Sequence, residues 1–177
     1  MFKNLSLLLL VPFMAHLSAV YPSKVTFLPT NTKVDPSTLY TIEEVPAWVQ
    51  LFDYDMNPLS SNEDAKLGFQ ALLFDKQENL EDKIVFLRSA FKILKKESAS
   101  HETMAYYSHF TSIEYTPSFQ QAVLHSFRVF RDGVWLDLHH KSHLWVSWRG
   151  PLHKILRFES HDFQPGDVLE FQYSLKQ

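Results

Sequence analysis

The chain of 177 residues contains no cysteine, and glycine occurs only four times. The absence of cysteine excludes disulfide bonds, thiolate zinc ligands and a cysteine nucleophile. Four glycines are too few to build a glycine-rich loop that cradles phosphate groups. The formal net charge is −3, from 17 basic and 20 acidic residues, so the basic excess of a nucleic-acid binder is also missing. We therefore expect neither a nucleic-acid partner nor a bound cofactor.

Aromatic side chains, in contrast, are frequent, with 15 Phe, seven Tyr and four Trp. Hydrophobic residues make up 45% of the chain and charged residues 21%, which is the composition of a folded globular protein. The length is sufficient for one domain with its own core. Because aromatic rings suit the pleated surface of a half-buried sheet, the composition favours a mainly β domain.

Residues 1–19 have the pattern of a signal peptide. Lys3 supplies a positive charge, Leu5 to Ala15 form an apolar stretch too short to span a membrane, and Ala19 is a small residue at the predicted cleavage site. We expect no stable membrane span after cleavage. An uncleaved N-terminal anchor is the alternative, because Leu17 is not ideal at its place before the cleavage site. Export without cysteine favours a bacterial protein of the periplasm or the extracellular space.

Residues 20–45 are polar and interrupted by proline, which predicts an extended lead-in to a domain that covers residues 46–177. In this domain, alternating apolar and polar side chains predict short strands. The strands are expected at 69–74, from 113 onward, and at 123–130, 134–138, 144–148, 155–158 and 168–175. Asp132-Gly133 predicts a tight type I′ hairpin turn. Several short strands separated by turns suggest a β-sandwich with little helix.

Three segments give more detailed predictions. In residues 123–130, strict alternation places Val123, His125 and Phe127 on one face. In residues 168–175, apolar side chains alternate with polar ones, which predicts a strand buried on one face only. In residues 83–96, apolar side chains recur at helical spacing, so the local pattern predicts a helix, with a long twisted strand as the alternative.

Several short motifs occur in a characteristic order along the domain. They are Val45-Pro-Ala-Trp-Val49, Leu72-Leu-Phe-Asp-Lys-Gln77, Ser112-Ile-Glu-Tyr-Thr-Pro117, Leu124-His125, Phe127-Arg-Val-Phe-Arg-Asp-Gly133 and Pro165-Gly-Asp-Val-Leu-Glu170. Their order and spacing resemble the bacterial domain-of-unknown-function family 3857 over roughly Pro46 to Gln177. The resemblance implies an immunoglobulin-like antiparallel β-sandwich, with a strand rather than a helix over Asp82 to Leu94.

The same resemblance implies an exported protein in which a transglutaminase-like domain usually follows. The sequence departs from this pattern, because it ends where that domain would begin. The transglutaminase-like domain relies on a Cys-His-Asp arrangement, for which no cysteine is present. The resemblance therefore supplies no catalytic residue, and we expect that the chain is not an enzyme.

Histidines 139, 140 and 143 are the weak candidates for a metal site. Imidazoles at this spacing can bind zinc, which would allow a metal-dependent hydrolase. However, His139, His140 and His143 follow a predicted strand in a polar loop, and adjacent side chains on a strand face opposite ways. We therefore expect exposed loop histidines and no metal.

Two further patterns imitate known sites incompletely. Asp53, Asp55, Asn57 and Asp64 have the spacing of a calcium loop, but Pro58 stands where such a loop needs glycine. We expect a solvated loop with Asx turns instead. The second pattern, Ser89-Ala-Phe-Lys92, matches the Ser-x-x-Lys motif of some acyl-enzymes, but the accompanying Ser-Asp-Asn and Lys-Thr-Gly motifs are absent.

Three functions remain open from the sequence. The first is a non-catalytic exported module that docks onto a transglutaminase-like domain or another envelope protein. The second is a stand-alone module that binds a glycan or a peptide through Trp135, Trp145 and Trp148, although such aromatic side chains more often belong to a core or an interface. The third is the hydrolase based on the three histidines.

Overall fold

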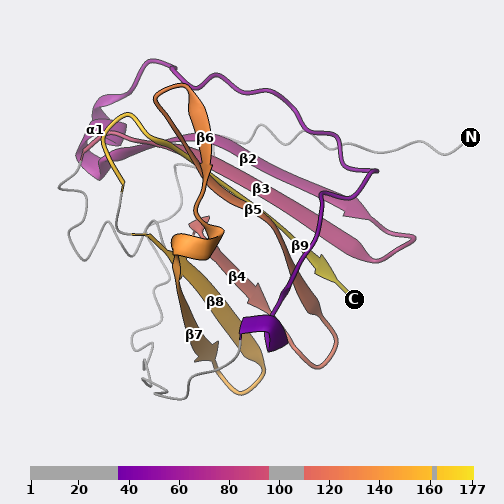
Figure 1. The fold of residues 1–177 in the computed structure, drawn as a ribbon. Coiled ribbons are helices and arrows are strands. Elements are labelled where there is room, and N and C mark those ends of the chain that lie inside the picture. The colour runs from indigo at the N-terminus through magenta and orange to yellow at the C-terminus, as the bar shows by residue number, and fades with distance from the viewer. Residues whose placement is uncertain (1–35, 96–109, 161–162) are drawn as a thin grey trace, which may run out of the picture.

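The computed structural model describes residues 36–95, 110–160 and 163–177. The expected signal peptide and most of the expected lead-in lie outside these ranges. The described residues form two β-sheets and little helix, as Figure 1 shows. The prediction of a mainly β chain is therefore confirmed.

The larger sheet has the strand order β1-β5-β9-β3-β2, and β6 pairs with one end of β5. Its strands are β1 (Thr41–Ile42), β2 (Phe69–Asn79), β3 (Ile84–Ile93), β5 (Gln121–Arg131), β6 (Val134–Asp137) and β9 (Val168–Lys176). Neighbouring strands are antiparallel except for β1, which runs parallel to β5. Thr41–Ile42, within the expected lead-in, thus contributes a strand to the sheet.

The smaller sheet has the order β4-β8-β7, and all of its pairs are antiparallel. Its strands are β4 (Ser112–Tyr115), β7 (His143–Arg149) and β8 (His153–Glu159). The short helices are η1 (Pro36–Thr38), α1 (Asn62–Leu67) and η3 (His139–Lys141). α1 begins at a capping box between Ser61 and Asp64 and ends at Gly68, whose φ of 80° suits glycine.

The two sheets share one hydrophobic core. Phe171 of β9 contacts Phe127 of β5 in the same sheet and Phe158 of β8 in the smaller sheet, with ring centroids 5.6 and 5.4 Å away. Leu169 and Leu156 are also buried in this cluster. Burial of such large aromatic side chains is the dominant favourable contribution to folding. The aromatic residues of the sequence therefore hold the two sheets together.

Residues 84–93 form strand β3, so the helix predicted from the local pattern is wrong, whereas the strand implied by the family resemblance is observed. β3 pairs with β2 on one side and with β9 on the other. Both of its faces are covered, so apolar side chains such as Phe86 and Phe91 point in opposite directions. A strand buried on both faces loses its alternation, and the remaining apolar spacing imitates a helix.

β9 also differs from its prediction, because it is buried on both faces. Leu169 and Phe171 enter the core as expected, but Glu170, Gln172 and Ser174 on the opposite face are buried as well. The segment of residues 43–60 lies over this face of the sheet, where it contacts Glu170 of β9 and Arg88 and Lys92 of the neighbouring β3. We call it the covering segment, and Figure 1 shows it running from the β1 end of the molecule towards α1.

The hairpin between β5 and β6 has the predicted turn. Asp132 and Gly133 both have positive φ, 52° and 82°, as a type I′ turn requires. The strict alternation predicted for β5 is interrupted at His125, where the register with β9 shifts between Leu124 and Ser126. Leu124 and Phe127 both reach the core as a result, and His125 turns towards the covering segment.

Candidate functional site

The most concentrated group of charged side chains lies around Glu170, between the larger sheet and the covering segment. Glu170 is 0% exposed. Arg88 donates to its Oε2 from Nε and Nη2 at 2.9 and 2.6 Å. Arg128 contacts the other oxygen, Oε1, from Nε and Nη2 at 2.7 and 2.6 Å. The single negative charge of Glu170 is thus shared by two arginines. One of them comes from β3 and the other from β5, the two strands that pair with β9.

Other groups complete this cluster. Gln172 donates to Oε1 of Glu170 at 2.8 Å, and the Tyr54 hydroxyl donates to Oε2 at 3.2 Å. Arg88 donates from Nη1 to the carbonyl oxygen of Phe52, also in the covering segment, at 2.8 Å. The pKa of Tyr54 is raised by burial and by the negative charge of Glu170, so its hydroxyl remains a donor. The cluster is therefore a closed network that binds the covering segment to the sheet.

A second buried carboxylate serves the turn that precedes β9. Asp167 accepts two hydrogen bonds from Arg131 in a fork, at 2.9 and 2.6 Å. It also accepts one from the backbone N–H of Gln164 at 2.8 Å. Bidentate pairs of this kind are strong and directional. Asp167 therefore fixes the Pro165-Gly166 turn to the end of β5.

His125 and Ser174 have the contact distance of a catalytic serine–histidine pair. His125 Nδ1 lies 3.0 Å from the carbonyl oxygen of Glu43, which can only accept, so Nδ1 carries the proton. Nε2 of His125 then accepts from the Ser174 hydroxyl at 2.7 Å. A nucleophile must reach its substrate, whereas Ser174 is 0% exposed in the middle of the sheet. The pair acts as a connection between the covering segment and β9.

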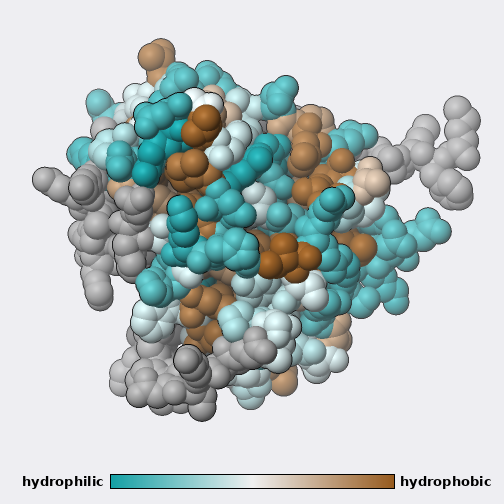
Figure 2. All heavy atoms as spheres, viewed as in Figure 1, coloured by the Kyte–Doolittle hydropathy of each residue, from teal (hydrophilic) through white to brown (hydrophobic). Residues whose placement is uncertain are grey.

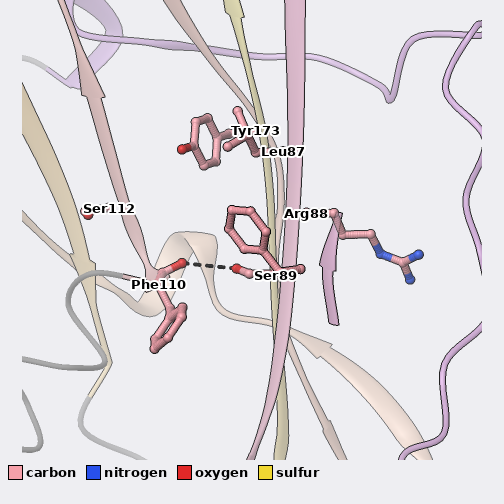
Figure 3. A pocket seen from close by; sticks show the side chains of 7 residues that line it. Leu87, Arg88, Ser89, Phe110, Ser112 and Tyr173 are labelled. Atoms are coloured by element: carbon pink, nitrogen blue, oxygen red, sulfur yellow. Dashed lines mark hydrogen bonds between the residues drawn. The ribbon is translucent and has the colours of Figure 1, made fainter. Parts of the chain in front are cut away.

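Figure 3 shows a hollow on the other face of the larger sheet, lined by Phe74, Leu87, Ser89, Phe110, Ser112 and Tyr173. Its volume is about 40 Å³, whereas pockets for small ligands measure roughly 300–1,000 Å³. The Ser89 hydroxyl donates to the carbonyl oxygen of Phe110 at 3.2 Å, and Arg88 points away from the hollow. Burial and the charge of Glu114 raise the pKa of Tyr173 to about 12, so its phenol stays protonated. This hollow has room for a few water molecules only.

The three candidate histidines do not converge on one point. His139 and His140 lie in η3 with their ring centroids 4.6 Å apart, and His139 Nε2 contacts the hydroxyl of Tyr40 at 3.0 Å. Burial and the neighbouring His140 lower the pKa of His139. His143 is exposed at the start of β7. Within the described ranges, no three His, Cys, Asp or Glu side chains are grouped as metal ligands would be.

The three tryptophans lie on different surfaces. Trp145 and Trp148 are three residues apart on the regular strand β7, so their side chains leave opposite faces of it. Trp135 belongs to β6 in the other sheet, where the guanidinium of Arg128 stacks on its ring at 4.1 Å. Trp135 thus supports the Glu170 cluster. The structure does not bring the three rings together into one patch.

The loop that imitates a calcium site uses its oxygens for other contacts. Asp55 accepts from the backbone N–H of Asn57 at 2.8 Å, which is the predicted Asx turn, and Asn57 accepts from Lys92 at 2.7 Å. Asp64 caps α1. Ser89 and Lys92 do not act together, because an odd spacing on a strand places them on opposite faces, and Lys92 Nζ contacts the carbonyl oxygen of Met56 in the covering segment.

The Glu170 cluster was not predicted from the sequence, although a signal for it exists. Arg88 and Glu170 both stand among apolar residues inside long strands, where an unpaired charge would be costly. Opposite charges in such strands indicate mutual pairing, but only the strand order makes Glu170 a neighbour of both arginines. That order follows from long-range pairing and not from local pattern.

Comparison of the chain with protein-family models, with curated protein sequences and with solved structures gave no match. In the described part of the chain, no helix has the length and apolar character needed to cross a lipid bilayer.

The first prediction concerns the charge of Glu170. Replacing Glu170→Gln keeps the shape but leaves Arg88 and Arg128 facing each other without a buried counter-charge. We expect the free energy of unfolding to fall by about 3 kcal/mol, the loss typical of one removed partner of a buried pair. Urea unfolding followed by circular dichroism measures this change.

The control for this substitution is Glu78→Gln, which removes an exposed ion pair with Lys76. Such exposed pairs contribute little, so the control should lie within about 0.5 kcal/mol of the wild type. Equal stabilities of the Glu170→Gln and Glu78→Gln variants would contradict the structural role of the cluster.

The second prediction concerns the pH dependence of stability through His125. Burial lowers the pKa of this imidazole, while Glu43 opposes the shift and Lys176 reinforces it. The unfolded chain therefore binds the proton more readily, and stability is lost as the pH falls through the usual histidine range and below it. Unfolding free energies measured between pH 8 and pH 5 should decline less steeply in a His125→Gln variant.

His139, whose pKa is also lowered, is the same in both proteins, so its contribution cancels in the comparison. Parallel stability curves for the wild type and the His125→Gln variant would show that His125 does not control this dependence.

Proposed function

We propose that the protein is a non-catalytic, exported module that docks onto a transglutaminase-like domain or another protein of the bacterial envelope. We further propose that its two sheets form an immunoglobulin-like β-sandwich of the family 3857 type. The shared core of the two sheets and the strand at residues 84–93 support this fold. The motifs between Val45 and Glu170 support the family.

One observation carries the non-catalytic role. The buried charged side chains of the described residues are Arg88, Asp167 and Glu170, and all of them take part in ion pairs that hold segments together. A catalytic acid or base needs contact with a substrate, whereas these carboxylates face arginines and backbone groups. These ion pairs stabilise the fold, so we expect contacts with a partner protein to involve surface side chains.

The surface of the described residues carries separate apolar spots, and the hollow beside Ser89 is too small for an ordinary ligand. Figure 2 shows brown apolar side chains on this face as several spots between hydrophilic ones. Exposed large apolar residues include Phe74 and Leu80 on and beside β2, and Trp145 on β7. Single exposed residues are common on any protein, but aromatic side chains such as Phe74 and Trp145 are also typical anchors of protein interfaces. Docking therefore fits this surface better than binding a small ligand.

Export is tested by expressing the whole chain in a bacterium and determining the N-terminus of the product by mass spectrometry. We expect a periplasmic protein that begins at Val20, because the small residue Ala19 precedes the predicted cleavage site. An Ala19→Arg variant serves as the matched control and should keep its full length at the membrane. Recovery of uncleaved wild-type protein from the membrane would favour the anchor, and recovery from the cytoplasm would contradict export.

Docking is tested first in the genome, where we expect a gene for a transglutaminase-like protein beside the gene of this chain, and then with that protein in purified form. We expect the two purified proteins to elute together from a size-exclusion column and to give a saturable signal in calorimetry. The complex should persist when the partner's catalytic cysteine is replaced by alanine, because docking does not require chemistry. Separate elution at concentrations of tens of micromolar would contradict the proposed partner.

A further inference from the structure

The charge of this protein is distributed unevenly. Residues 138–158 contain Lys141, Arg149, Lys154 and Arg157 but no aspartate or glutamate. The rest of the chain holds the other 13 basic residues and all 20 acidic ones, so its formal charge is −7. The basic segment consists mainly of η3 and the hairpin of β7 and β8. A chain with a net negative charge thus presents one hairpin of opposite sign.

The tip of this hairpin combines positive charge with exposed apolar side chains. Trp148 is 50% exposed, and Leu152 in the turn is 60% exposed. Trp148 lies directly opposite Lys154 in the hairpin, and the Lys154 ammonium lies 5.0 Å from the centroid of the Trp148 ring. Arg149 follows Trp148 and is exposed. The hairpin tip therefore combines two exposed apolar side chains, those of Trp148 and Leu152, with the positive charges of Arg149 and Lys154.

A second turn lies at the same end of the molecule. The hydroxyl of Thr116 and Nδ1 of His153 are 3.2 Å apart, so the β4–β5 turn is hydrogen-bonded to the hairpin. Phe119 in this turn is 61% exposed. Figure 1 shows both turns at the end of the molecule opposite to α1. The apolar character of the hairpin tip thus extends to a neighbouring turn.

Among the described residues, Arg149 forms an ion pair with Glu114 that is exposed to solvent. Its Nη1 lies 2.9 Å from Oε2 of Glu114, but the two side chains are 54% and 37% exposed. Exposed ion pairs of this kind contribute little and exchange readily with other partners. An anionic surface can therefore compete with Glu114 for the guanidinium.

We propose that the tip of the β7–β8 hairpin binds the surface of a bilayer that contains anionic lipids. Tryptophan prefers the headgroup level of a bilayer, and an exposed leucine gains from entering the boundary with the acyl chains. Arg149 and Lys154 are next to Trp148 in the hairpin, so their charges come close to the lipid phosphates when Trp148 and Leu152 enter this layer. A soluble polyanion would attract the same charges but would offer no apolar environment to Leu152.

The experiment is co-sedimentation of the exported protein, from which residues 1–19 have been cleaved, with vesicles of phosphatidylglycerol and phosphatidylcholine, compared with vesicles of phosphatidylcholine alone. We expect binding to the anionic vesicles that weakens as salt is added. Lys154→Glu should lower the partition coefficient roughly tenfold or more, because it removes an attractive charge and adds a repulsive one. Leu152→Ala should lower it roughly fivefold by removing an apolar anchor.

Matched controls are available near the other end of the molecule. Lys66→Glu makes the same change of charge in α1, and Leu59→Ala makes the same truncation at a residue that is 99% exposed. Both should bind nearly as the wild type does. All variants lack the apolar residues 5–15, which are removed with the signal peptide, so these residues do not contribute to lipid binding. Circular dichroism checks folding, and Lys154→Gln replaces Lys154→Glu if the latter does not fold.

Depth measurements give an independent readout. Lipids carrying a quencher at the headgroup level should quench tryptophan fluorescence in the wild type more than in a Trp148→Phe variant. The proposal is wrong if the protein binds neutral and anionic vesicles equally, or if Lys66→Glu weakens binding as much as Lys154→Glu. It is also wrong if the protein binds dextran sulfate but not the anionic vesicles, because the hairpin would then recognise a soluble polyanion.

Discussion

The burial of one carboxylate, that of Glu170, constrains the rest of this structure. An ionised carboxylate in the interior is tolerated only when it is paired and fully hydrogen-bonded. Both neighbouring strands must therefore bring an arginine to it, which requires β9 to lie between β3 and β5 in the observed register. A shift of either strand by one residue would turn Arg88 or Arg128 to the opposite face and leave the charge unpaired. The network thus specifies the arrangement of the larger sheet beyond what apolar packing alone would select.

The covering segment follows from the same constraint. Glu170, Gln172 and Ser174 form one face of the central strand, and a sheet face made of such groups would be solvated if nothing lay over it. Tyr54, Phe52 and Glu43 contribute a hydroxyl and two carbonyl oxygens that satisfy Glu170, Arg88 and His125. The covering segment has no helix or strand, yet it packs on the sheet as an additional layer. Hydrogen bonds to side chains hold it there instead of strand pairing.

The local sequence pattern predicts features that depend on neighbouring residues, such as turns. It does not predict features that depend on residues far away in the sequence. Asp132-Gly133 gave the hairpin because positive φ is a property of the turn itself. The helix prediction for β3 is wrong because both faces of this strand are buried, which removes the alternation of apolar and polar residues. One of these faces is buried by the covering segment, which lies far away in the sequence. The Glu170 cluster and the role of Trp135 beneath Arg128 also depend on strand order, which no local window contains. Alternation along β7 separates the side chains of Trp145 and Trp148, and Trp135 lies in the other sheet. His139 and His140 lie side by side in η3, whereas His143 begins β7.

The position of the charges bears on the kind of function that the fold can support. Glu170 and Asp167 face arginines in ion pairs that connect segments of the fold. The hairpin of β7 and β8 carries exposed charges that are mostly basic, and its acidic residue, Glu159, stands at the end of β8, away from the tip. This hairpin belongs to the smaller sheet, which packs against the larger sheet through the shared aromatic core. The proposed docking and lipid binding therefore both depend on surface side chains, while the buried ion pairs hold the larger sheet and the covering segment together.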